Sequence, residues 1–260
     1  MHIQVLSSGS EGNSALVRAG ETNVLVDAGL TLTEMEARID SARIPIDSIR
    51  HVLVTHGHLD HARSAGGVAR KARATLHCSE NIMKHPAARR ARTLATIPIG
   101  RTFEVGGTNG DAVHLTPVPL PHDCDPTVAF RIEHKGRCAA ILTDIGRPCE
   151  EVARALEGVH VLVLEFNYDP EMMRRGPYPP ELQKRITGDR GHLSNEQAAA
   201  MLGMLAGGEL HTVVLAHLSQ KNNTPELALE AARGALARRG RSDVRVLVAS
   251  QHAVGENLEV

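Results

Sequence analysis

The segment 55–61 reads Thr-His-Gly-His-Leu-Asp-His and constrains this chain more than any other part of it. Four potential metal ligands lie within six residues, directly after an apolar run: His56, His58, Asp60 and His61. His56 and His58 are two residues apart, so their imidazoles point to the same side of an extended turn, whereas the neighbours Asp60 and His61 diverge. Two imidazoles directed to one ion, and a carboxylate with an imidazole directed to another, indicate a dinuclear metal site.

Short runs rich in Val, Ile and Leu recur along the chain between Gly, Pro, Asp or Asn residues, a pattern typical of β-strands. The expected strands are 2–6, 14–18, 23–26, 51–54, 112–117, 128–132, 138–142, 159–164, 212–216 and 244–249. Capping boxes predict helices from Thr33 to about Ala42 and from Ser194 to about Leu205. The pair Thr224-Pro225 predicts a third, to about Arg238. This order favours packed sheets with helices outside, in one domain of residues 1–260.

Composition excludes several classes of protein. Hydrophobic residues make up 42% of the 260 residues, enough for a sizeable core. A net charge of −1 and an aromatic content of 2% exclude a uniformly basic protein and argue against base stacking. From Arg63 to Arg101, however, nine basic residues accompany one acidic residue, Glu80, a local net charge of +8. This segment could follow a phosphate backbone or form a solvated helix face.

The chain carries no pattern of a secretory signal and no run of about 18 apolar residues, so we expect a cytoplasmic protein that does not enter a membrane. Its four cysteines include no Cys-x-x-Cys pair and are expected to be reduced. Cys124, two residues from His122, is expected to be a thiol that does not bind metal. The oligomeric state is left open.

These motifs resemble the metallo-β-lactamase superfamily. The resemblance implies an α+β fold, the αββα sandwich, in which two mixed β-sheets pack face to face with helices outside. The segment Leu-Val-Asp-Ala-Gly at 25–29 resembles the first motif of that superfamily, which implies that Asp27 orients the histidine loop. Three strand-end residues resemble its remaining ligands: His122 in Pro-Leu-Pro-His-Asp, Asp144 in Ile-Leu-Thr-Asp-Ile-Gly and His217 in Leu-Ala-His-Leu-Ser.

The resemblance also implies how two divalent ions are held. His56, His58 and His122 would bind the first ion, Asp60, His61 and His217 the second, and Asp144 would bridge them. Zn²⁺ or Mn²⁺ is expected, with Ni²⁺ or Fe²⁺ as alternatives. Two such ions lower the pKa of a shared water and generate hydroxide for hydrolysis. Di-iron relatives often carry glutamate where this chain has His58, which favours hydrolysis over oxygen chemistry.

Three features favour a phosphodiester substrate. The triplet His217-Leu218-Ser219 resembles the H-[LF]-S motif of the nuclease branch. His192 directly precedes an expected helix, whose N-terminus attracts phosphate, and could protonate a leaving alkoxide or simply be solvated. The turn around Ser8 and Asn13 could present N–H groups to an anion, although a tight hairpin explains it equally well.

The complete motif set resembles the YycJ/WalJ-like single-domain metallo-hydrolases. This implies a metal-dependent nuclease, with 5′→3′ exonuclease action on DNA in mismatch repair as the narrower expectation. The candidate catalytic residues are Asp27, Asp60 and His192, and the candidate substrate-binding residues are Ser8, Asn13, Tyr168, His192 and Ser219. Tyr168 replaces a histidine common in relatives, which would change affinity or end preference. Two alternatives stay open: a hydrolase of a cyclic phosphodiester, thioester or lactone, and a non-catalytic binding protein.

Overall fold

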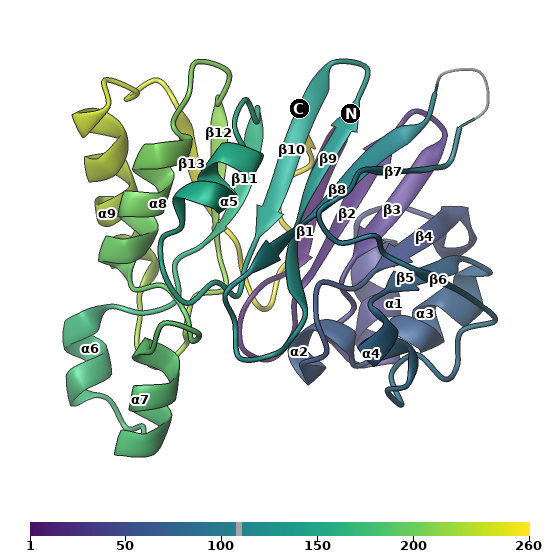
Figure 1. The fold of residues 1–260 in the computed structure, drawn as a ribbon, viewed down its shortest axis with the longest axis horizontal. Helices are drawn as coiled ribbons and strands as arrows, with labels where there is room; N and C mark the ends of the chain where they lie inside the picture. Colours follow the sequence, from purple (N-terminus) through teal and green to yellow (C-terminus); the bar gives the residue numbers. More distant parts are fainter. Residues whose placement is uncertain (108–110) are drawn as a thin grey trace. The chain divides into compact units, whose positions relative to one another are not determined.

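The structure, a computed structural model, describes residues 1–107 and 111–260 (Figure 1). It contains two mixed seven-stranded sheets with helices, which agrees with the predicted fold class. The chain divides into two compact units: unit 1 comprises residues 1–117, 132–137 and 250–260, and unit 2 comprises 118–131 and 138–249. That residues 1–260 form one domain stays a prediction.

Unit 1 contains the first sheet, in the order β14-β1-β2-β3-β4-β5-β6. Its strands are β1 (His2–Ser7), β2 (Ser14–Ala19), β3 (Thr22–Val26), β4 (Ile49–Leu53), β5 (Thr75–Cys78), β6 (Thr93–Thr96) and β14 (Leu258–Glu259). Pairing is antiparallel from β14 to β3 and parallel from β3 to β6. Since β14 pairs with β1, the two chain ends lie together within this unit (Figure 1).

The helices of unit 1 are short and cover the parallel half of its sheet (Figure 1). They are α1 (Leu32–Ser41), η1 (Ile46–Ser48), α2 (Leu59–Ala62), α3 (Ala65–Ala72) and α4 (Glu80–Met83), and the unit also holds β7 (Phe103–Val105). Met35 and Ile39 of α1 and Val68 of α3 are buried against Leu25 and Val52 of the sheet. Burial of side chains of this size contributes roughly 1.5–3 kcal/mol each.

The second sheet has the order β13-β12-β11-β10-β9-β8-β7. Its strands β8 (Val113–Leu120) and β9 (Thr127–His134) contribute residues to both units. The parallel strands of this sheet are β10 (Arg137–Leu142), β11 (Val161–Glu165), β12 (Thr212–Ala216) and β13 (Arg245–Val248), and all of their residues except Arg137 belong to unit 2. Every residue of β11 and β12 is buried, as expected for strands covered on both faces.

The helices of unit 2 are α5 (Glu150–Ala155), α6 (Pro170–Arg175), α7 (Pro180–Thr187), α8 (Asn195–Leu205) and α9 (Pro225–Arg238). Helices α8 and α9 lie side by side (Figure 1). Met201 and Leu202 of α8 and Leu236 of α9 join Leu164 and Leu215 of the strands in one apolar core. Among the described residues, none of the helices has the length and hydropathy of a transmembrane span.

All ten predicted strands are present, and α8 and α9 begin at their predicted caps, Ser194 and Thr224. The predicted cap of the first helix is wrong, because Thr31 and not Thr33 caps α1. The Thr31 hydroxyl accepts a hydrogen bond from the backbone of Glu34 at 3.4 Å, and the Glu34 carboxylate accepts one from the backbone of Thr31 at 3.0 Å. Thr31 and Thr33 lie two residues apart and are equally suited to cap a helix. Only the backbone conformation identifies Thr31 as the cap.

Candidate metal centre

Three predicted site residues follow the ends of strands and adopt a left-handed backbone conformation. Asp27 directly follows β3 with φ 62°, His217 directly follows β12 with φ 55°, and Asp144 lies two residues after β10 with φ 61°. This conformation is uncommon for residues other than glycine and is found disproportionately at functional sites. The chain therefore turns sharply out of the sheet at each of these positions.

In unit 1 the Asp27 carboxylate organises the histidine loop. Its Oδ1 accepts a hydrogen bond from the Thr55 backbone N–H at 2.8 Å. Its Oδ2 accepts from the Thr55 hydroxyl at 2.8 Å and lies 2.7 Å from His61 Nδ1. A proton on Nδ1 shared with Asp27 leaves the lone pair of His61 on Nε2, the tautomer that can bind a metal.

The four predicted ligands of the histidine loop lie close together. The ring of His56 lies 4.7 Å from that of His58 and 4.3 Å from that of His61, centroid to centroid. Asp60 Oδ2 is 3.6 Å from His61 Nε2. The chain passes so close to Gly29 that a Cβ there would lie 1.7 Å from the Asp60 carbonyl oxygen, so only glycine fits.

Asn13 and Ser8 border this loop and are buried. Asn13 Nδ2 lies 3.0 Å from His61 Nε2, where its N–H meets the lone pair that is predicted to bind metal. The backbone N–H of Asn13 also donates to the Asp60 carbonyl at 2.7 Å. The Ser8 hydroxyl contacts Asn13 Oδ1 at 3.3 Å. These contacts position the loop, and the substrate-binding role of both residues stays a prediction.

In unit 2 three predicted site histidines surround one carboxylate oxygen. Asp144 Oδ1 lies 3.8 Å from Nε2 of His122, 3.8 Å from Nε2 of His217 and 3.7 Å from Nδ1 of His192. Asp144, His192, His217 and Glu165 each offer a ligand atom within 4.8 Å of the others. Imidazoles and carboxylates at this spacing fit a divalent transition metal.

Glu165 is a site residue that the sequence analysis missed. It ends β11, is fully buried, and accepts hydrogen bonds from the backbone N–H groups of Asp144 and Leu193, each at 2.7 Å. Its Oε2 lies 3.3 Å from His192 Nδ1 and 3.4 Å from His217 Nδ1. The sequence did contain a signal for Glu165, since it is a carboxylate at the end of an otherwise apolar strand. A buried charge requires partners, so such a residue is a candidate for the site.

Glu165 and His192 lie within ion-pair distance and shift each other's pKa. Burial by itself would raise the pKa of Glu165, but the charge of His192 and hydrogen bonds from His192 and His217 hold it well below its usual range. Burial would lower the pKa of His192, but the charge and hydrogen bond of Glu165, with the charge of Asp144, raise it. The pair therefore favours a protonated His192, which can donate a proton.

Backbone and side-chain partners orient the two predicted histidine ligands of unit 2. His122 Nδ1 lies 3.0 Å from the Gly191 carbonyl, so a proton on Nδ1 leaves the Nε2 lone pair directed toward Asp144. The Asn167 amide donates to the His217 carbonyl at 2.8 Å and lies 3.1 Å from His217 Nδ1. Asn167 is a second residue that orients a predicted ligand and that the motifs did not indicate.

Tyr168 and Ser219 lie inside unit 2. Tyr168 is 5% exposed, and burial, followed by the charges of Glu165 and Glu196, raises the pKa of its phenol. The Ser219 hydroxyl accepts from the backbone N–H groups of Lys221 and Asn222 at 3.4 and 3.2 Å. Their predicted contact with substrate stays a prediction. All four cysteines are free thiols, and Cys124 is half-buried.

The sequence profile of the beta-lactamase superfamily domain matches residues 22–218. Exodeoxyribonuclease YycJ of Bacillus anthracis is 34% identical over 235 residues, which cover 88% of this chain and 86% of that protein. Exodeoxyribonuclease WalJ of Streptococcus pneumoniae is 32% identical over 231 residues, which cover 86% of this chain and 84% of that protein.

Solved structures share the fold over almost the whole chain. The metallo-β-lactamase fold protein YhfI of Bacillus subtilis superposes with a TM-score of 0.75 at 14% identity, covering 97% of this chain and 98% of its own. Zn²⁺-bound PqqB of Methylobacterium extorquens superposes with a TM-score of 0.72 at 19% identity, covering both chains completely. At these identities the likeness establishes the fold alone.

Proposed function

Because the chain belongs to the metallo-β-lactamase superfamily and, within it, to the family of the exodeoxyribonucleases YycJ and WalJ, we propose that it hydrolyses the phosphodiester bonds of DNA from an end. The observation that carries this proposal is the 34% identity over 88% of the chain, combined with imidazole and carboxylate ligands in both units. The narrower expectations of 5′→3′ polarity, mismatch repair and a cytoplasmic location belong to the same proposal.

The proposed cofactor is a pair of divalent ions, Zn²⁺ or Mn²⁺. The ligands would be His56, His58 and His122 for one ion, Asp60, His61 and His217 for the other, and Asp144 between them. The contact of Asp27 with His61 Nδ1 and that of Gly191 with His122 Nδ1 support this assignment, because each leaves an Nε2 lone pair for a metal.

When bound, such ions polarise the phosphodiester and activate a water molecule for attack on phosphorus. His192 would then donate its proton to the leaving oxygen, and Glu165, 3.3 Å from His192 Nδ1, keeps that proton available. Basic residues of segment 63–101 would hold the phosphates of the strand. Contacts to phosphate carry no base identity, which agrees with the low aromatic content of 2%.

The test measures cleavage of end-labelled duplex DNA by the purified protein with Mn²⁺ or Zn²⁺, beside bis-p-nitrophenyl phosphate, a lactone and a thioester. We expect stepwise release of nucleotides from one end of the DNA, and loss of this release with Asp60→Ala. Metal analysis should show that Asp60→Ala retains fewer ions than the wild type. Hydrolysis of the lactone or thioester without cleavage of DNA under either metal would refute the nuclease and support a small-molecule hydrolase.

A further inference from the structure

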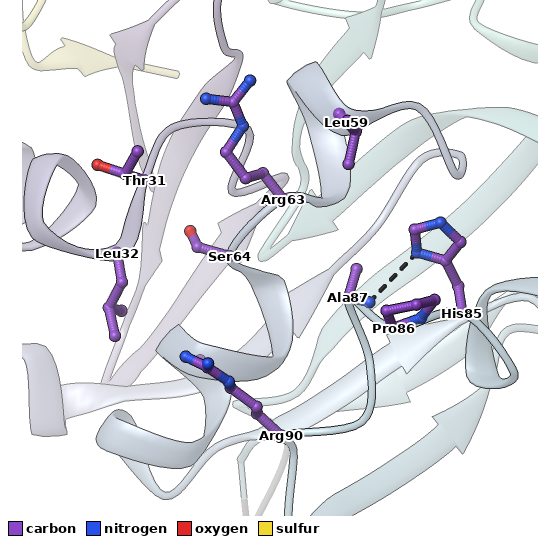
Figure 2. A pocket seen from close by; sticks show the side chains of 10 residues that line it. Thr31, Leu32, Leu59, Arg63, Ser64, His85, Pro86, Ala87 and Arg90 are labelled. Atoms are coloured by element: carbon purple, nitrogen blue, oxygen red, sulfur yellow. Dashed lines mark hydrogen bonds between the residues drawn. The ribbon is translucent and has the colours of Figure 1, made fainter.

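A pocket of about 380 Å³ lies in unit 1 beside the histidine loop (Figure 2). Its volume falls within the range of roughly 300–1,000 Å³ that is usual for small-ligand sites. Its lining comes from the start of α1, from α2 and α3, and from the segment 85–90.

The short helix α2 contributes to both the predicted metal centre and the pocket. Asp60 and His61 of α2 are predicted ligands, while Leu59, their direct neighbour, lines the pocket with 59% of its surface exposed. Arg63, at the end of the same helix, also lines it. A group held in the pocket therefore contacts the same turn of helix that carries two predicted ligands.

A close backbone contact forms the wall of the pocket opposite α1. Gly66 N–H donates to the Ala87 carbonyl at 2.9 Å, and a Cβ on Gly66 would lie 2.4 Å from that oxygen. The absence of a side chain at Gly66 thus lets the segment 85–90 approach α3. Figure 2 shows His85 and Pro86 on one side of the pocket and Leu32 on the other.

The lining combines apolar surface with hydrogen-bond donors and cations, and includes no acidic residue among the residues that the structure describes there. Leu32, Leu59 and Pro86 supply the apolar surface. Arg63 and Arg90 are exposed, and within the described part of the chain neither forms an ion pair with a carboxylate. Glu34 acts on Arg63 only through its charge, because the Glu34 carboxylate binds Thr31.

His85 provides a further hydrogen-bond donor to the pocket. Its Nδ1 accepts a hydrogen bond from the Ala87 backbone N–H at 3.2 Å (Figure 2). In the neutral ring the proton is therefore on Nε2, which can donate to an anion. Each guanidinium group and the imidazole N–H can bind a phosphate oxygen, while the leucines and the proline suit the flat face of a base or a sugar.

We infer that this pocket binds one nucleotide of the DNA strand next to the phosphodiester that is cleaved. Arg63, Arg90 and His85 contact different phosphates of the strand around that nucleotide, and its base and sugar lie against Leu32 and Leu59. This inference rests on the proposed function and names where the strand is held. It assigns a binding role to Arg63 and Arg90, two of the nine basic residues of segment 63–101.

The first experiment fills the pocket without changing charge. A Cβ on Gly67 would lie 3.5–3.9 Å from the Leu32 side chain, in ordinary contact, so Gly67→Leu places its side chain in the pocket. Gly203→Leu is the matched control, because it makes the same change in a helix where a Cβ meets nothing within 4 Å. Binding of a fluorescein-labelled single-stranded oligonucleotide is measured by fluorescence anisotropy in EDTA. We expect Gly67→Leu to weaken binding about tenfold and Gly203→Leu to leave it unchanged.

The second experiment removes one positive charge at a time by replacing an arginine with alanine. Arg63→Ala and Arg90→Ala should each reduce the slope of log affinity against log salt by about 0.7, the value for one phosphate contact to a single strand. Arg239→Ala, at an exposed arginine that directly follows α9 and lies outside both the pocket and segment 63–101, should leave the slope unchanged. Gly67→Leu should keep the wild-type slope despite its weaker binding, because it removes no cation.

The outcomes separate this inference from the proposed function. Wild-type binding by Gly67→Leu, or equal effects of Arg63→Ala and Arg239→Ala, would overturn the nucleotide pocket even if the wild type degrades DNA. Failure of the wild type to bind the oligonucleotide would overturn it as well. A wild type that binds through these residues but cleaves no DNA with either metal would leave the pocket intact and refute the exonuclease. Thermal unfolding of each variant shows that its fold is retained.

Discussion

Glu165 links the chain after β10 to two of the histidines that lie near Asp144 in unit 2. Its two oxygens accept from the backbone at Asp144 and Leu193 and approach the side chains of His192 and His217. A carboxylate without exposure remains ionised only with such partners. Its role is therefore to position the chain after β10 and the two histidines.

Replacing Glu165 with glutamine tests this positioning role. The glutamine side chain would keep the shape but would turn one accepting oxygen into an N–H₂ group facing a backbone N–H. We expect Glu165→Gln to lower the free energy of unfolding by about 1–3 kcal/mol, the cost of an unsatisfied buried donor. It should also lower the pKa of His192, measured by NMR titration. A glutamine variant with unchanged stability and unchanged His192 titration would contradict the role.

Replacing His192 tests its proposed role as the proton donor. We expect His192→Ala to slow DNA hydrolysis by about 10²–10⁴-fold, the usual contribution of a general acid, while the content of bound metal stays that of the wild type. Mass-spectrometric metal analysis distinguishes this outcome from loss of an ion. An unchanged rate would mean that His192 is only a solvated residue at the start of α8.

At the scale of elements, β4 and β5 carry a pair of histidines away from the metal loop. His51 Nδ1 lies 3.0 Å from His77 Nε2, and the ring of His77 stacks on Phe103. Burial, followed by the charge of His51, lowers the pKa of His77 to about 4. His77 is therefore neutral in the folded protein at pH values where the unfolded chain is protonated.

This shift predicts a pH dependence of stability. Between pH 6.5 and about 4 the unfolded chain binds a proton that the folded protein does not, so the free energy of unfolding falls as pH falls through this window. The shift corresponds to at most about 3 kcal/mol. His77→Phe should remove this part of the dependence in denaturation curves at pH 7 and pH 5. His252→Phe, a substitution at an exposed histidine, should not.

The turn after β3 leads to a second prediction at the scale of elements. Gly29→Ala brings a Cβ within 1.7 Å of the Asp60 carbonyl and must displace the histidine loop, so we expect a loss of more than about 2 kcal/mol of stability together with weaker metal binding. Gly203→Ala, in α8 with open space, should instead gain about 0.5–1 kcal/mol. Thermal unfolding of both variants measures the contrast. Equal stability of the two would refute the close approach.

At the scale of the whole molecule, a net charge of −1 conceals the +8 of segment 63–101. If this segment binds phosphates, the double variant Arg89→Ala/Arg92→Ala should weaken DNA binding and reduce its salt slope. The same change at Arg238 and Arg239, two exposed arginines of the second basic group, should have little effect. Anisotropy titrations at several salt concentrations measure both. Equal losses would mean that DNA binding follows total charge.

The pattern of apolar residues was sufficient to predict the long apolar strands from the sequence. It did not predict β5, β6, β7 and β14, which have two to four residues each. The strand β6 reads Thr-Leu-Ala-Thr and is mostly exposed, so it forms a strand because β5 offers a parallel partner. Such pairing is non-local and leaves little trace in the segment itself. The ambiguity of the helix cap is local, because Thr31 and Thr33 each precede a glutamate by three residues and only the backbone conformation selects Thr31.

The sequence by itself determined which side chains are candidates for the metal centre: the predicted ligands of the histidine loop, together with Asp27, His122, Asp144 and His217, follow from residue type and from their places at strand ends. Only the tertiary structure decided what holds them. Glu165 approaches two histidines that lie far from it along the chain, and Gly66 admits the segment that closes the nucleotide pocket. Ligand identity is a local property of a motif, whereas burial and close approach depend on which distant segments pack together.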